Sequence, residues 1–132
     1  MKEFKLQIVT PDGIKFDGMA ESVLVTCAEG DVEIMAGHVD YFASLATGRT
    51  RIIANGKTMT ASSSGGFLSV TGGEVNVVAI TVEFSDEIDV ERAIKAKELA
   101  EAQIKDTKDN VALDNAKAKL QRALNRIKIA SK

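Results

Sequence analysis

The sequence predicts an α+β fold, in which an N-terminal antiparallel β-sandwich, residues 1–87, is followed by a C-terminal two-helix antiparallel hairpin, residues 88–132. Up to Glu87, short segments of alternating polar and apolar residues recur about every ten residues with turn signals between them, which is typical of an antiparallel sandwich or a flattened barrel. After Glu87, alanines and larger apolar residues recur at spacings of three and four, which is typical of helices. The charge divides at the same place. Residues 1–87 contain six Lys and Arg and twelve Asp and Glu, whereas residues 88–132 contain eleven Lys and Arg and seven Asp and Glu.

Turn signals separate the expected strands. Residues 4–10 alternate up to Pro11-Asp12-Gly13, where proline presets φ and glycine accepts a positive φ. Asn55-Gly56 predicts a hairpin, because both positions tolerate the positive φ of a type I′ turn. The expected strands are residues 4–10, 14–20, 22–27, 32–35, 41–45, 50–54, 67–70 and 75–82, and residues 62–66 are expected to form a loop.

The second part reads as two helices joined by a short connection at residues 105–109, and a connection of this length favours antiparallel neighbours. Ser85, Asp86 and Asp89 are candidate N-caps of the first helix. A hairpin with so thin a core is expected to detach and rearrange at a lower cost than the sandwich. The stripes expected to face each other are Ala93, Ala96, Ala100 and Ile104 on the first helix, and Leu113, Ala116, Leu120, Ala123 and Ile127 on the second.

Three arginines are expected at one end of this hairpin. If its connection centres near residue 107, Arg92 lies near Arg122, and Asp89 lies near Arg126. Arg122 and Arg126 are also i,i+4 neighbours on one helix face. Two interpretations remain open on the residues alone: a solvated ion-pair cluster that contributes little stability, or an anion site for a nucleotide phosphate.

Other chemistries are poorly supported. Gly56-Lys57-Thr58 resembles the end of a phosphate-binding P-loop, but Arg51 stands where that loop requires a glycine. His38, the only histidine, lies in a predicted turn, and the nearby carboxylates of Asp31, Glu33 and Asp40 have no metal-ligand spacing. We therefore expect no metal site and no catalytic residues. The basic second helix lacks aromatic residues for base stacking, so we expect no nucleic-acid partner.

The sequence also bounds where the protein acts. Cys27 is the only cysteine, which favours a reducing compartment. No segment approaches the roughly 20 apolar residues of a membrane span, and the start lacks a signal-peptide core. We expect a soluble cytoplasmic protein that reaches a membrane only through partners.

Several segments together carry a resemblance to a known family. These are Thr10-Pro11-Asp12-Gly13, Gly30, Gly37-His38, the stretch Ser64-Gly65-Gly66-Phe67-Leu68-Ser69-Val70, and Ile88-Asp89-Val90-Glu91-Arg92-Ala93. In this order and over essentially the whole chain, the sequence resembles the epsilon subunit of bacterial rotary ATP synthases. The resemblance implies a sandwich of about ten strands followed by two helices. The chain departs from the family pattern at Glu33, Ala36 and Asp40, in a stretch where family members often carry Gly and Pro.

The resemblance also implies a function without catalysis. The sandwich is expected to bind the gamma subunit and the ring of c subunits at the cytoplasmic face of the cell membrane, with no direct insertion into the membrane. The helices are expected either to fold back or to extend into the alpha and beta subunits and restrain ATP hydrolysis. The basic segment 110–132 suits that contact. Competing functions are a nucleotide-hydrolysing enzyme and a free-standing scaffold or adaptor.

Some family members bind ATP as a regulatory ligand in the folded hairpin. Their motif Ile/Leu-Asp-x-x-Arg-Ala matches Ile88, Asp89, Arg92 and Ala93 at every specified position. The arginines of the second helix match Arg122 and Arg126, and the acidic residue before the hairpin matches Glu83. By resemblance, the guanidinium groups are expected to bind the phosphates, and Glu83 or Asp89 to accept hydrogen bonds from the ribose or base. No metal is required in this arrangement.

Overall fold

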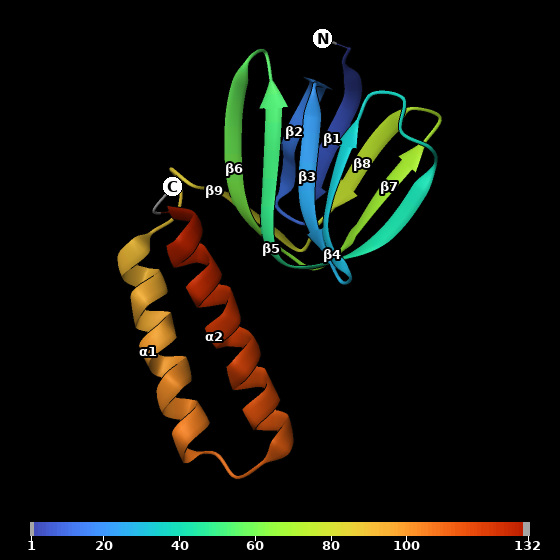
Figure 1. Ribbon diagram of the computed structural model, residues 1–132. Helices are drawn as coiled ribbons and strands as arrows, with labels where there is room; N and C mark the ends of the chain where they lie inside the picture. The colour runs from blue at the N-terminus through green and yellow to red at the C-terminus, as the bar shows by residue number, and fades with distance from the viewer. Residues whose placement is uncertain (1, 131–132) are drawn as a thin grey trace. The chain divides into compact units, whose positions relative to one another are not determined.

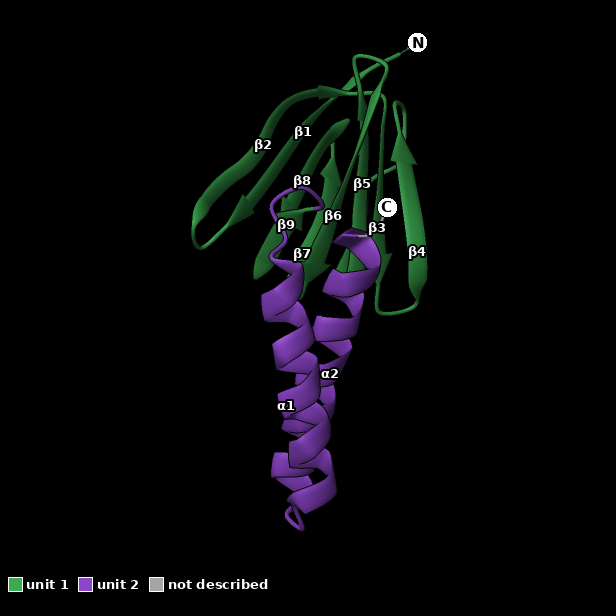
Figure 2. Cartoon of the chain, turned by 90° about the vertical axis from the view of Figure 1, so that its left-hand side faces the viewer, with its two compact units in different colours: residues 1–84 green, residues 85–132 purple. Residues whose placement is uncertain are grey.

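The computed structural model describes residues 2–130 (Figure 1). The chain forms two compact units, and the division falls between Phe84 and Ser85. Figure 2 colours the strand-rich unit green and the helical unit purple. The predicted class, a β-sandwich followed by a helical hairpin, is confirmed.

Nine strands are found among the described residues, and they fall into two sheets. The first sheet has the order β2-β1-β8-β7-β5, and the second has the order β4-β3-β5-β6-β9. Every pair is antiparallel except β1 and β8, which run parallel with Leu6 opposite Val75. The strands are β1 Phe4–Thr10, β2 Gly13–Ala20, β3 Ser22–Cys27, β4 Gly30–Met35, β5 Tyr41–Ala54, β6 Lys57–Ser64, β7 Phe67–Thr71, β8 Glu74–Val78 and β9 Thr81–Phe84.

Strand β5 belongs to both sheets. Its first residues, Tyr41 to Ser44, pair with β7, and residues 48–54 pair with β6. The two strands expected at 41–45 and 50–54 are thus one strand, and Gly48 makes no turn. A Cβ added to Gly48 would overlap the side chain of Thr26 on β3, so glycine is required there by the close approach of neighbouring strands.

The chain passes between the sheets a second time at Ala79 and Ile80. The amide of Ala79 donates to the carbonyl of Val9 in the first sheet, and the amide of Ile80 donates to the carbonyl of Ser64 in the second. The single strand expected at 75–82 is therefore two strands with different partners, β8 and β9.

The core lies between the two sheets and follows the predicted alternation. Along β3, the side chains of Val23, Val25 and Cys27 are buried. The serines expected in a loop are instead in β6, where Ser62 and Ser63 are buried. The hydroxyl of Thr50 donates to that of Ser63 at 2.9 Å, which satisfies two polar groups inside the core.

The helical unit contains α1, Val90–Asp106, and α2, Asn110–Ala130. The two helices pack along each other, and the connection at residues 107–109 closes the hairpin as predicted (Figure 1). Four residues of the predicted stripes are buried, Ala93 and Ala100 on α1 and Ala116 and Ala123 on α2. Ile129 is also buried and was not among the predicted stripe residues.

Candidate functional site

The start of α1 is organised by the predicted motif. Asp89 is the N-cap: its carboxylate accepts a hydrogen bond from the Arg92 amide at 3.1 Å, and its carbonyl accepts one from the Ala93 amide at 3.0 Å. Of the three candidate caps, Asp89 is therefore the one used. Ile88 and Ala93 are buried, whereas the Arg92 side chain is exposed. The motif thus fixes the helix start and leaves one guanidinium group available at the surface.

The two arginines of α2 lie in its second half, four residues apart. Arg122 is exposed and Arg126 is half-buried. Figure 1 shows that the end of α2 lies beside the start of α1, so Arg92 and the α2 arginines belong to the same half of the hairpin. Within residues 2–130, neither Arg92 nor Arg122 forms an ion pair.

Glu83, the remaining predicted site residue, belongs to the other unit. It lies in β9, where it pairs with Ser62 of β6, and its side chain is half-buried. The six other predicted residues, Ile88, Asp89, Arg92, Ala93, Arg122 and Arg126, all lie in the helical unit.

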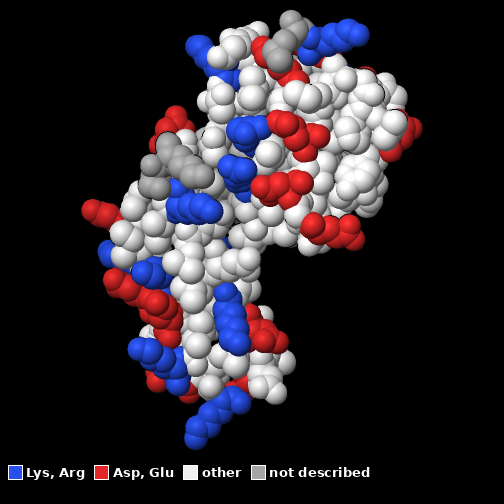
Figure 3. Space-filling model, in the orientation of Figure 1, with Lys and Arg blue, Asp and Glu red and all other residues white. Residues whose placement is uncertain are grey.

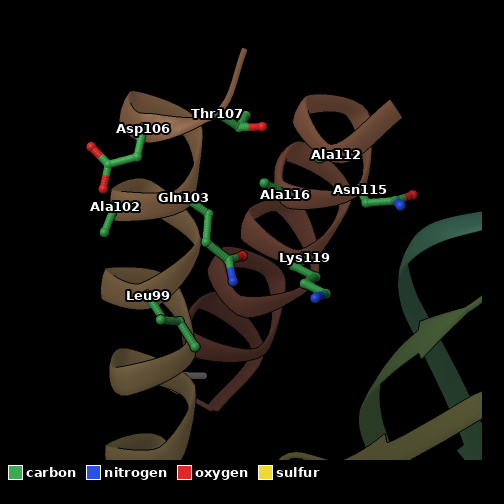
Figure 4. A pocket seen from close by; sticks show the side chains of 9 residues that line it. All are labelled: Leu99, Ala102, Gln103, Asp106, Thr107, Ala112, Asn115, Ala116 and Lys119. Atoms are coloured by element: carbon green, nitrogen blue, oxygen red, sulfur yellow. The ribbon is translucent and has the colours of Figure 1, made fainter. Parts of the chain in front are cut away.

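A hollow of about 560 Å³ opens between the helices nearer to their connection (Figure 4). Figure 4 shows Leu99 and Gln103 extending from α1 toward α2, and Lys119 extending from α2. No sequence pattern predicted this hollow. Its lining residues are Leu99, Ala102, Gln103, Asp106, Thr107, Ala112, Asn115, Ala116 and Lys119.

The hollow reveals which flanks of the helices face the same side of the hairpin. An α-helix has 3.6 residues per turn, so residues four or seven positions apart lie on the same flank. On α1, Arg92 is seven positions before Leu99 and Leu99 is four before Gln103, so these three residues share a flank. Leu99 and Gln103 line the hollow. The flank of α1 that forms the hollow therefore carries Arg92 toward the helix start.

The same reasoning applies to α2. Asn115 and Lys119 line the hollow, and Arg122 and Arg126 follow at spacings of three and four on the same flank. Arg92, Arg122 and Arg126 consequently lie on one side of the hairpin, the side on which the hollow opens. Such an arrangement suits the binding of an anion between the two helices.

Comparison with known proteins gives the family. The model of the ATP synthase delta/epsilon chain β-sandwich domain matches residues 3–85, and the model of the delta/epsilon chain long α-helix domain matches residues 86–131. The chain belongs to the ATP synthase delta/epsilon chain family. The resemblance to the bacterial epsilon subunit, which the motifs predicted, is confirmed.

Curated relatives of this family match over nearly their whole lengths. The ATP synthase epsilon chain of Bacillus velezensis is 40% identical over 130 residues, which cover 98% of each chain. That of Ruminococcus albus is 38% identical, with 100% of this chain and 99% of the relative covered.

Solved structures share the fold at lower identity. A chain of the Euglena gracilis mitochondrial ATP synthase aligns with a TM-score of 0.83 and 24% identity, covering 93% of this chain and 78% of its own. A chain of the Tetrahymena thermophila mitochondrial ATP synthase central stalk and c-ring aligns with a TM-score of 0.67 and 14% identity, covering 98% of this chain and 97% of its own.

In the sandwich of this epsilon-family chain, Asp31 and Glu33 form structural contacts. Asp31 accepts a hydrogen bond from the Thr26 hydroxyl at 2.8 Å and pairs with Arg49 at 3.5 Å. Glu33 pairs with Arg51 in the same way. No group of His, Cys, Asp and Glu among residues 2–130 has the arrangement of a metal site.

Two other sequence features have structural roles in the sandwich. Asn55 and Gly56 form the predicted hairpin turn with φ values of 52° and 71°, so Gly56-Lys57-Thr58 is no part of a strand-turn-helix P-loop. Cys27 is buried, and this burial, together with the charge of Asp31, raises the pKa of its thiol. A buried, neutral thiol packs as a small apolar residue.

The outer face of the first sheet carries an apolar surface that no sequence pattern predicted. Phe42 is 65% exposed, and its ring stacks on that of Phe67 at 5.3 Å between centroids. Phe67 lies opposite Val78, Val78 opposite Val9, and Val9 opposite Ile14, so an apolar row crosses four strands. In the space-filling view, part of the sandwich surface is free of charged side chains, whereas both signs of charge occur along the hairpin (Figure 3).

No helix within residues 2–130 is long and apolar enough to cross a bilayer.

Proposed function

We propose that this chain is a non-catalytic subunit of the ATP synthase central stalk, in which the sandwich binds the gamma subunit and the c-ring and the hairpin regulates ATP hydrolysis. The membership of the delta/epsilon family over both units supports the assignment to this complex. The protein is then peripheral at the cytoplasmic face of the cell membrane, held there by its partners.

The apolar row around Phe42 and Phe67 supports the contact with the rotor. Large contiguous exposed apolar surfaces on soluble domains mark sites of protein association. Copurification of the full chain with gamma and c subunits tests this assignment. A chain that fails to associate with them is the free-standing adaptor that the sequence left as the alternative.

The proposed regulatory ligand is ATP, bound on the side of the hairpin that carries Arg92, Arg122 and Arg126. What supports this proposal is a hollow between two packed helices, whose lining residues share one flank with Arg92 on α1 and with Arg122 and Arg126 on α2 by helix periodicity. Guanidinium groups bind phosphate oxygens with paired hydrogen bonds, and this geometry requires no metal. Turnover of ATP by the isolated chain is not expected.

Bound ATP would stabilise the closed hairpin, because a ligand shifts an equilibrium toward the state to which it binds better. The open hairpin would present the basic residues of α2 to acidic segments of the alpha and beta subunits. Low ATP would thus favour the extended, inhibitory form, and high ATP the folded form.

Isothermal titration calorimetry of the full chain with ATP tests the site. Arg92→Ala and Arg126→Ala are each expected to weaken binding at least tenfold, about 1.4 kcal/mol. Lys105→Ala is the matched control, because Lys105 is exposed in the last turn of α1, away from the flank that carries Arg92. Unchanged affinity in both arginine variants would rule out the assignment.

A further inference from the structure

Lys119 is a cation of the hollow that the predicted site does not include. It lines the hollow, its side chain is exposed, and within residues 2–130 it forms no ion pair. It lies three residues before Arg122 and seven before Arg126, so all three share one flank of α2. The arginine cluster is therefore one part of a longer row of positive charge.

This basic row has the dimensions of an extended anion. At a rise of 1.5 Å per residue, Lys119 and Arg126 are about 10 Å apart along the helix axis, with Arg122 between them. A single phosphate group would leave part of the row unused. A chain of linked phosphates would use all of it.

The row is bounded at both ends. Beyond Lys119 the hollow is lined by the neutral side chain of Asn115 and by Asp106, a carboxylate that disfavours a phosphate closer to the connection. At the opposite end, the Asp89 carboxylate caps α1, and the last carbonyls of α2 carry the negative end of the helix dipole. A polyphosphate therefore fits between these ends, with its nucleoside toward Asp89 and its terminal phosphate toward Lys119.

We infer that Lys119 binds the terminal phosphate of a nucleoside triphosphate and makes the site prefer a triphosphate to a diphosphate. This inference rests on the nucleotide site proposed above. The ammonium group is a compact charge with three donors, and the amide of Gln103, which extends from α1 toward α2, adds a donor across the hollow (Figure 4). A diphosphate is shorter by one phosphate and ends at Arg122, where it gains nothing from Lys119.

The test is titration of the full chain with ATP and, separately, with ADP. Lys119→Ala is expected to weaken ATP binding about tenfold and to change ADP binding less than about twofold, so that the preference for ATP falls. Lys117→Ala is the matched control, because Lys117 is an exposed lysine of the same helix on a different flank and does not line the hollow. It is expected to leave both affinities unchanged.

Two outcomes would overturn the inference. An equal loss for both nucleotides would show that Lys119 acts only through the overall positive charge, and an unchanged ATP affinity would show that it does not touch the ligand. Lys119→Gln, which keeps most of the side-chain stem, provides the same comparison if far-ultraviolet circular dichroism shows that Lys119→Ala disturbs the helix.

The same titrations separate this inference from the proposal on which it rests. If the unaltered chain binds neither nucleotide, or if neither Arg92→Ala nor Arg126→Ala weakens binding, the nucleotide site itself is wrong. If Arg92→Ala weakens binding while Lys119→Ala leaves the ratio of the two affinities unchanged, the site stands and only the role of Lys119 is refuted.

Discussion

Thr26 connects three strands of the second sheet through one side chain. Its hydroxyl donates to Asp31 on β4 at 2.8 Å and accepts from the Arg49 amide on β5 at 3.1 Å. The same side chain fills the space that a Cβ on Gly48 would need. From the sequence, Thr47-Gly48 is expected to be a turn that separates two strands. A glycine between two apolar segments can either form a turn or make room for the side chain of a neighbouring strand, and the sequence alone does not distinguish these two roles.

Gly66 also lies where a neighbouring strand leaves no room. Its φ is +98°, and a Cβ there would overlap the carbonyl oxygen of Val78. Gly73 has a similar φ of +81°, but a Cβ added there would meet no atom within 4 Å. Comparing alanine substitutions at Gly66 and Gly73 therefore separates two contributions to destabilisation, the strain of a left-handed backbone and the overlap with a neighbouring strand.

We predict that Gly66→Ala lowers the free energy of unfolding by at least about 2 kcal/mol more than Gly73→Ala does. Both variants have an alanine at positive φ, which costs about 1–2 kcal/mol, and only Gly66→Ala also forces the backbone at Val78 to move. Urea unfolding followed by far-ultraviolet circular dichroism provides the measurement. Equal losses in the two variants would contradict the close packing at Gly66.

At the scale of the elements, alanine determines how the helices pack. Ala93 and Ala100 on α1 and Ala116 and Ala123 on α2 are almost fully buried. Such small side chains let two helices approach closely, but they remove little apolar area from water, so the stabilisation from burial is modest. We therefore expect the helical unit to be less stable than the sandwich.

We predict that Ala123→Leu destabilises the hairpin by about 1–3 kcal/mol, because the larger side chain must push the helices apart. Ala118→Leu is the control, since Ala118 is exposed on the same helix and leucine is also a good helix former. Amide hydrogen exchange in α1 and α2 measures the effect. A hairpin equally protected in both variants would show that Ala123 is not at a close contact.

The two helices and the Asn55-Gly56 turn could be predicted from the sequence because their signals are local. The Asn55-Gly56 turn and the alanine stripes depend only on nearby residues. The passage of the chain from the first sheet to the second at Ala79 and Ile80 could not be predicted. The apolar run continues through these residues without a turn signal, although the strands that pair with it change. Ser62 and Ser63 were misassigned because their burial depends on strands β5 and β9, which are distant in sequence.

The candidate site was predictable only in part. The motif from Ile88 to Ala93 and the spacing of the α2 arginines could be read directly from the sequence. Lys119 could not be selected among the lysines of α2 until the hollow showed which flank of that helix faces the same side as Arg92. Whether the six helical residues bind ATP together with Glu83 stays a prediction.

At the scale of the whole molecule, the two units each have their own set of internal contacts. The family models divide the chain at nearly the same place, with the sandwich ending at residue 85 and the helical part beginning at residue 86. The strands close their core without any residue of α1 or α2 in the main apolar cluster.

We predict that a chain lacking residues 88–132 still folds into the sandwich, because the core cluster is complete without the helices. Cooperative thermal unfolding and dispersed amide resonances would show this. Within the proposed function, the same truncation is expected to relieve the restraint on ATP hydrolysis in the assembled enzyme. An unfolded truncation product would contradict the independence of the two units.

Because β5 runs unbroken from one sheet into the other, a force applied to the exposed aromatic face at Phe42 is carried along a covalent backbone to the strands that pair with residues 48–54. The two layers cannot slide past each other without breaking this strand or its hydrogen bonds. The sandwich therefore behaves as a stiff block, and within the proposed function this stiffness suits it to transmit torque between the gamma subunit and the c-ring.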